Sequence, residues 1–211
     1  CYRLWHENRV LQQTTKPEIL RSDLSSLVLD LALWGVEEFE ELKWLDVPSE
    51  DAISETKKVL VELETLDESF KITAFGKDAL SLGVHPRFAY MILKANEMGL
   101  AYEACLLCAL LSEKEILKNS FRDSDLTSRF TSLYERDFDP AYVNAQSAKE
   151  ALKQAEFFYA KLQRIKKVPP KKSGFDMDKL AVLLLLAYPD RLAKRRGEND
   201  AKYKLSNGKG A

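Results

Sequence analysis

The sequence predicts a mainly α-helical protein, with short strands only near the two chain ends. The 211 residues include only 8 Gly and 7 Pro, whereas residues that favour helices, such as Leu, Ala, Glu and Lys, are frequent. Apolar residues recur every three to four positions over several long segments, which is the period of an amphipathic helix. Hydrophobic residues make up 45% of the chain, so one large or two small cores can form.

The first two helices are predicted from apolar spacing and from their end signals. Residues 23–34 repeat apolar side chains at helical spacing, with Ser22 as the expected cap and Gly35 as the expected stop. A second helix is expected to start at Pro48, because proline is tolerated in a first turn. It is expected to continue to about residue 66.

A short strand and a third helix complete this region. Residues 70–72 are expected to form a small strand, and Thr73 is expected to cap a helix that runs to about Leu80. The order helix, helix, short strand, helix over residues 17–82 is typical of a winged-helix module. Other small helical domains share the same pattern, so this alternative stays open.

From His85 onward the pattern predicts a helical bundle. Glycine, polar and proline-containing stretches separate four candidate helices, Pro86–Met98, Ala101–Leu111, Asp125–Arg136 and Ala141–Lys166. A basic linker over residues 166–174 follows. Residues 175–188 then predict a buried helix that ends at Pro189.

Both chain ends are predicted to be strands of larger structures. Residues 1–5 alternate in polarity, which indicates a strand whose partners lie elsewhere. Residues 203–205 are also strand-like, and the following Asn207-Gly208 is a type I′ hairpin signal whose return strand is missing. The sequence is therefore expected to be a segment of a longer protein.

The net charge of −1 hides a strong asymmetry along the chain. Residues 1–160 carry 18 Lys and Arg and 28 Asp and Glu, whereas residues 161–211 carry 14 and 5. The two parts therefore have net charges of −10 and +9. The basic part can bind phosphate backbones or form a solvated surface, and both interpretations stay open. Tyr188 and Tyr203 flank its second basic cluster and could stack on bases.

No reactive residue belongs to a recognisable catalytic or metal site. Cys105 and Cys108 have CxxC spacing, but their apolar neighbours favour core packing over redox or zinc chemistry. His85 precedes a proline, which is typical of a helix cap, and the acidic run 37–41 is expected to be solvated surface. The sequence has no phosphate-binding loop, so ATP turnover by this chain alone is not expected.

The composition favours a soluble cytoplasmic protein without a membrane segment. The three cysteines have no disulfide-framework spacing, which fits a reducing compartment. The longest apolar run, residues 180–187, is far shorter than the ~20 residues that a membrane span requires.

Several stretches resemble DEAH-box ATP-dependent helicases, and in particular the HrpB subfamily. Residues 1–5 (CYRLW) resemble the strand after the last conserved motif of the second RecA-like domain, and residues 17–24 (PEILRSDL) resemble the opening of the winged-helix domain. Residues 44–48 (WLDVP), 72–77 and 82–89 are similar to later parts of that region. The tail, residues 187–197 and 203–211, resembles the HrpB signature and is the most specific match.

The resemblance implies a domain order. The expected units are 1–16, a terminal strand and linker of the second RecA-like domain; 17–82, a winged helix; 83–168, a helical ratchet-like bundle; and 169–211, the start of the HrpB-type C-terminal region. ATP and Mg²⁺ would bind upstream domains, and no cofactor, metal or catalytic residue is expected in this chain.

The resemblance implies that the chain is an accessory C-terminal module of an RNA or DNA helicase. Such a module helps hold single-stranded nucleic acid and couples RecA-domain motion to unwinding, so its expected partners are single-stranded RNA or DNA and the upstream RecA-like domains. Candidate nucleic-acid contacts, from the resemblance and from the basic tail, are Arg21, Arg87, Lys94, Arg191, Lys194, Arg195, Arg196 and Lys209.

Two other functions stay open. A winged-helix regulator would read DNA with one helix, but the helix expected over residues 51–66 carries several Asp and Glu beside Lys57 and Lys58, which disfavours that interpretation. A helical adaptor that binds protein partners is the other alternative.

Overall fold

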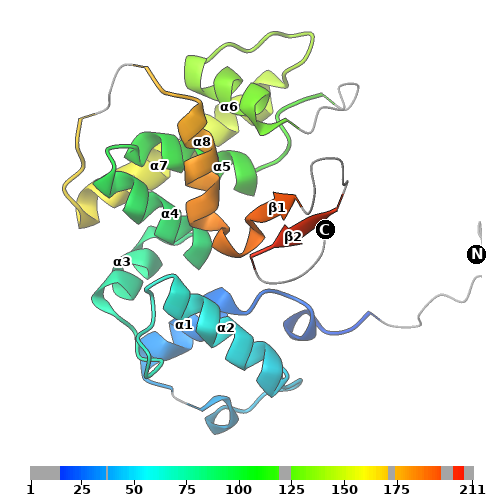
Figure 1. Ribbon diagram of the computed structural model, residues 1–211, viewed down its shortest axis with the longest axis vertical. Helices are drawn as coiled ribbons and strands as arrows, with labels where there is room; N and C mark the ends of the chain where they lie inside the picture. Colours follow the sequence, from blue (N-terminus) through cyan, green and yellow to red (C-terminus); the bar gives the residue numbers. More distant parts are fainter. Residues whose placement is uncertain (1–14, 37, 119–124, 171–173, 196–201, 207–211) are drawn as a thin grey trace, which may run out of the picture.

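The computed structural model describes residues 15–36, 38–118, 125–170, 174–195 and 202–206. Within them, eight α-helices and one two-stranded sheet form two lobes with separate hydrophobic cores (Figure 1). The predicted fold class, mainly α with few short strands, is confirmed. Residues 1–5, for which a strand was predicted, lie outside the described residues. None of the described helices is long and apolar enough to cross a membrane.

The first lobe, described residues 15–82, packs α1 against α2 and α3. Its elements are η1 (Glu18–Leu20), α1 (Ser25–Trp34), η2 (Phe39–Glu41), α2 (Glu50–Glu62) and α3 (Ala74–Leu82). Leu29 and Leu60 are completely buried in its core.

Two end signals of this lobe, Gly35 and Thr73, act as predicted, whereas α2 begins at Glu50, after the Ser49 cap, and not at Pro48. Gly35 has φ of +82° and ends α1, and the Thr73 hydroxyl accepts a 2.9 Å hydrogen bond from the Gly76 N–H at the start of α3. The prediction for Ser22 was wrong, because the Asp23 carboxylate accepts from the Ser25 N–H at 2.7 Å instead. Asp presents an acceptor that is already charged, which suits the positive end of a helix.

The small strand predicted over residues 70–72 does not form. Leu66 and Ile72 make a single antiparallel bridge, and Phe70 between them has φ of +60°. A left-handed residue interrupts the extended backbone that a ladder requires. The segment is therefore a tight turn, and the winged-helix assignment stays a prediction.

The second lobe, residues 83–188, surrounds one buried helix. Its helices are α4 (Pro86–Glu97), α5 (Ala101–Ser112), α6 (Leu126–Glu135), α7 (Ala145–Ile165) and α8 (Asp178–Ala187). Every residue of α5 from Ala101 to Leu110 is buried. Cys105 and Cys108 lie in this core, where burial raises the pKa of Cys108 to about 12. Their predicted role in core packing is confirmed.

His85 joins the two lobes at the start of α4. Its Nδ1 accepts a 3.3 Å hydrogen bond from the Arg87 N–H, which confirms the predicted cap. A neutral imidazole that accepts at Nδ1 carries its proton on Nε2. This Nε2 lies 3.4 Å from Asp23 Oδ1, and the contact holds the pKa of Asp23 well below its usual range.

Replacing Asp23 should loosen the junction between the lobes. Asp23→Ala removes the acceptor for the Ser25 N–H and for His85, so the free energy of unfolding should fall by about 1 kcal/mol, the value of a helix cap. Urea denaturation at neutral pH measures the loss. Asp23→Asn keeps a cap acceptor and is the matched control.

The same residue should make stability depend on acid pH. A carboxyl whose pKa is lower in the folded than in the unfolded chain stabilises the fold above its unfolded pKa, about 4, and this contribution is lost as the pH falls through and below that value. Between pH 6 and pH 3 the native chain should therefore lose more stability than Asp23→Asn. Identical pH profiles of the two proteins would contradict the role of the Asp23 charge.

Candidate nucleic-acid interface

The basic tail begins where Pro189 ends α8. The chain makes one turn, η3 (Pro189–Arg191), and then pairs β1 (Ala193–Arg195) with β2 (Tyr203–Leu205) in an antiparallel ribbon (Figure 1). The Ser206 hydroxyl donates to the Pro189 carbonyl at 2.8 Å, which fixes the end of β2 beside the start of η3. We call residues 189–195 and 202–206 the tail ribbon.

The predicted pairing of strand 203–205 was wrong. It was expected to follow Asn207-Gly208, but β2 pairs with β1, which precedes it. Asn207 and Gly208 themselves lie outside the described residues. The basic, strand-like run over residues 193–195 could have indicated this pairing.

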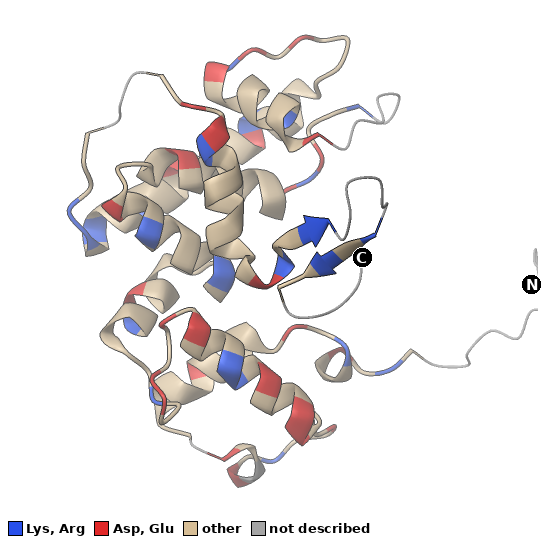
Figure 2. Ribbon diagram, viewed as in Figure 1, with Lys and Arg blue, Asp and Glu red and all other residues tan. Residues whose placement is uncertain are grey.

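The register of the ribbon places two lysines opposite each other. Lys194 pairs with Lys204, and Arg195 pairs with Tyr203. Like charges directly opposite each other in a ribbon are destabilising. Both lysines are exposed, and Figure 2 shows Lys and Arg along both strands. An anion bound between the strands would relieve the repulsion.

A groove of about 540 Å³ follows this basic surface. Its lining combines three cations with apolar and hydroxyl groups, and the residues are Leu192, Lys194, Arg195, Lys204, Leu205 and Ser206. No carboxylate belongs to this lining. The groove thus offers positive charge for phosphates and apolar surface for bases or sugars.

Arg87 fastens the start of the tail ribbon to α4. Its guanidinium donates to Asp190 Oδ1 at 2.6 Å and to the Ala187 carbonyl at 3.4 Å. The Arg87 side chain is only 13% exposed. The Phe88 ring meets Tyr188 edge-on at 6.1 Å, so aromatic packing supports the same junction. Arg87 is therefore placed to position the tail.

Arg191 and Tyr188 form the other side of this junction. The Arg191 guanidinium lies 4.8 Å from the centre of the Tyr188 ring, and Arg87 lies 5.6 Å from the same ring. Such cation–π contacts fix an arginine without neutralising its charge. Arg191 is thus held beside Tyr188, at the start of the segment that also carries Lys194 and Arg195.

Lys94 and Arg21 lie apart from the tail ribbon. Lys94 Nζ contacts Glu64 Oε2 at 2.8 Å and faces the rings of Phe75 and Tyr90, and the hydrogen bond with Glu64 raises the pKa of Lys94. The Arg21 Nε donates to the Lys16 carbonyl beside η1 at 3.3 Å.

The remaining predicted contacts, Arg196 and Lys209, lie outside the described residues. Lys204 was not among the candidates, although it lies directly opposite Lys194. Strand alternation could have suggested it, but the pairing register could not be read from one strand alone.

No family model matches the chain. Curated relatives do match it. The ATP-dependent RNA helicase HrpB of Escherichia coli is 32% identical over 197 residues, which cover 93% of this chain and 21% of the relative. A crystal structure of the E. coli DExH-box NTPase HrpB superposes with a TM-score of 0.70, at 30% identity, over 93% of this chain and 21% of that structure.

The chain is a homologue of part of the HrpB helicases. It spans about a fifth of the length of the E. coli HrpB that it matches. Other relatives match a smaller part of the chain. The ATP-dependent RNA helicase HrpA of E. coli is 33% identical over 119 residues, which cover 53% of this chain and 9% of the relative.

Removing the partner of Arg87 should release the tail ribbon in this HrpB homologue. Asp190→Ala leaves a mostly covered guanidinium unpaired, so the free energy of unfolding should fall by about 2 kcal/mol. The matched control is Glu156→Ala, which breaks a pair with Arg136 whose side chains are both 58% exposed. That loss should stay below about 1 kcal/mol. Urea denaturation compares them, and equal losses would contradict the positioning role of Arg87.

Proposed function

We propose that this chain is the accessory C-terminal module of an ATP-dependent RNA helicase, in which the tail ribbon helps hold a single strand. In this proposal residues 17–82 form a winged helix and residues 83–168 a ratchet-like bundle. They pack on the RecA-like domains of the same protein and couple their ATP-driven motion to unwinding. The homology to named RNA helicases supports the class of function.

The observation that carries the proposal is the Lys194–Lys204 pair on the tail ribbon. The pair lies in a segment, residues 161–211, with a net charge of +9. Its register brings like charges together at a cost in stability, and a phosphate backbone supplies the compensating anion. RNA is favoured over DNA because the relatives are named RNA helicases.

We do not assign binding of ATP and Mg²⁺ to this chain. The sequence contains no Gly-rich loop followed by Lys and Ser or Thr. The part of the chain that the structure describes holds no group of three His, Cys, Asp or Glu that could bind a metal ion. The proposal therefore assigns nucleotide chemistry to domains outside this segment.

A DNA-reading regulator has less support. The helix that would enter a major groove, α2, begins with Glu50 and Asp51 and also carries Glu55. Carboxylates at this position repel the phosphate backbone that a recognition helix must approach.

Binding of fluorescein-labelled single-stranded RNA to the 211-residue chain tests the proposal. Fluorescence anisotropy should show affinity that falls steeply between about 50 and 200 mM salt. In Lys194→Ala/Lys204→Ala, the affinity at low salt should fall about tenfold. The slope of log affinity against log salt should become shallower by about 1.4, since each phosphate contact to a single strand contributes about 0.7.

The control removes the same charge elsewhere. Lys149→Ala/Lys153→Ala changes two exposed lysines of α7 and should leave RNA binding within about twofold of the native chain. Absence of RNA binding at low salt, or equal losses in the two double variants, would contradict a role for the tail ribbon.

A further inference from the structure

An apolar groove lies beside the tail ribbon, between α8 and β1. Its volume is about 340 Å³, and its lining residues are Ala181, Leu184, Leu185, Tyr188, Arg191, Leu192 and Ala193. Among these residues, Arg191 alone is charged. Leu185 is 41% exposed and Leu192 is 59% exposed. Residues 180–189 contain no charged residue, so this side of α8 presents an apolar surface to solvent.

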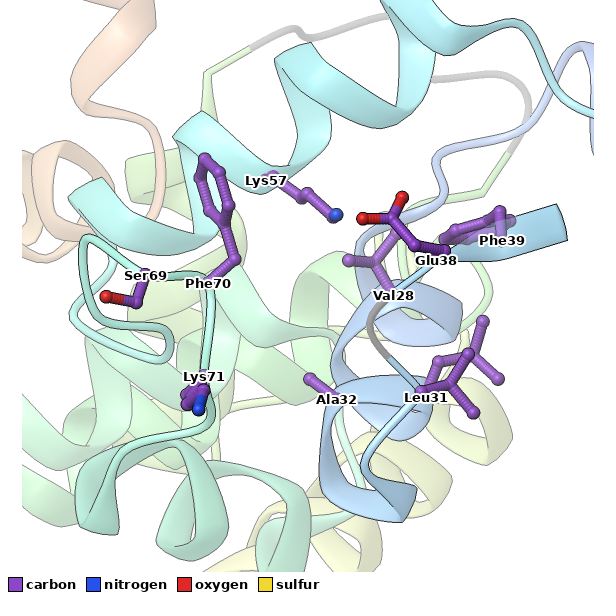
Figure 3. A pocket seen from close by; sticks show the side chains of 10 residues that line it. Val28, Leu31, Ala32, Glu38, Phe39, Lys57, Ser69, Phe70 and Lys71 are labelled. Carbon is purple, nitrogen blue, oxygen red and sulfur yellow. The ribbon is translucent and has the colours of Figure 1, made fainter. Parts of the chain in front are cut away.

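A pocket bordered by α1 and α2 in the first lobe lacks such a surface. Its wall residues Val28 and Leu31 are each only 3% exposed. In Figure 3 the Lys57 and Glu38 side chains point toward each other across that pocket, so its charges oppose each other. The groove beside the tail ribbon therefore differs from it in two respects, because its leucines are exposed and its charge is positive.

Leu192 lies where the apolar groove meets the basic groove of the tail ribbon, and it lines both. Its backbone is extended, with φ of −60° and ψ of 124°, and its carbonyl accepts a 2.8 Å hydrogen bond from the Ser206 N–H. Side chains two positions apart on an extended strand share one face and lie about 7 Å apart. Leu192 and Lys194 thus place an apolar group and a cation on the same face.

A ligand that uses both grooves needs apolar and anionic groups that alternate over a short distance. A single nucleic-acid strand has both, because each of its nucleotides joins a base to a phosphate. The exposed Arg191 guanidinium, which lies 4.8 Å from the centre of the Tyr188 ring, adds a planar surface on which an unpaired base can stack. In a duplex the bases are paired and stacked on one another, so they cannot enter the groove.

We propose that the groove between α8 and β1 is a base-binding site, through which the tail ribbon selects unpaired nucleic acid. Unpaired bases pack on Leu185, Leu192 and the Arg191 guanidinium. The phosphates of the same strand contact Lys194 and Lys204. This inference rests on the proposed function, because the lysines of the tail ribbon must hold the strand whose bases enter the groove.

Three fluorescein-labelled ligands test the inference on the 211-residue chain. They are a single-stranded RNA of about twelve nucleotides, an abasic strand with the same phosphates but no bases, and the RNA paired with its complement. Fluorescence anisotropy at about 50 mM salt should show that the RNA strand binds about tenfold more tightly than the abasic strand. The two single strands should have the same slope of log affinity against log salt, because their phosphates are the same.

The outcomes separate this inference from the proposed function. Equal affinities of the RNA and abasic strands, both falling steeply with salt, would overturn the base-binding site and leave the proposed function intact. Absence of binding by either strand would overturn both.

Leucine variants locate the site. Leu185→Ala/Leu192→Ala removes apolar surface without changing charge, so the affinity for the RNA strand should fall about tenfold. Its affinities for the abasic strand and for the duplex should change by less than about twofold, which also shows that the tail ribbon is still folded. Equal losses for the RNA and abasic strands would overturn the inference.

The matched control removes two leucines from the first lobe. Leu33 is 46% exposed and Leu45 is fully exposed, and neither lines the groove. Leu33→Ala/Leu45→Ala should leave all three affinities within about twofold of those of the native chain.

A peptide competitor distinguishes a nucleic-acid site from a protein site. An acidic amphipathic peptide with Leu and Glu at helical spacing presents apolar and anionic groups without bases. It should displace the labelled RNA strand at least about tenfold less effectively than unlabelled RNA of the same charge. Equal displacement would show that the groove binds an acidic protein segment and would overturn the inference.

Discussion

The burial of α5 is the constraint on which the second lobe depends. A helix that is covered on all sides needs neighbours on all sides, and α4, α6 and α7 provide them. Because α4 is held by this packing, its other face becomes a fixed platform. That platform carries α8 and, through Arg87, the first turn of the tail ribbon. The geometry of the basic groove thus depends on the packing of a buried, mainly apolar helix.

Polar groups hold the two lobes together at their junction. His85 caps α4 through one ring nitrogen and faces Asp23 through the other, and Asp23 in turn accepts from the first turn of α1. One imidazole therefore orients two helices. Lys94 and Glu64 make a second link, between α4 and the turn after α2. Two predicted nucleic-acid contacts, Arg87 and Lys94, both serve such internal links.

Helices could be predicted from this sequence because their signals are local. Apolar spacing, the Thr73 cap and Gly35 all act within one or two turns, so a single sequence reveals them. The Arg87–Asp190 pair joins residues 103 positions apart, and no local pattern encodes it. The turn at Phe70 could not be predicted for another reason. Its conformation depends on the Asp67 side chain, whereas the apolar residues around it resemble a strand.

Charge is separated along the chain. An acidic first lobe of net charge −10 and a basic segment of net charge +9 would attract each other if nothing held them apart. The Arg87–Asp190 pair and the Tyr188 contacts fix the tail ribbon on the second lobe instead. Its lysines stay exposed as a result. In the proposed function, the acidic lobe repels the polyanion that the basic ribbon attracts.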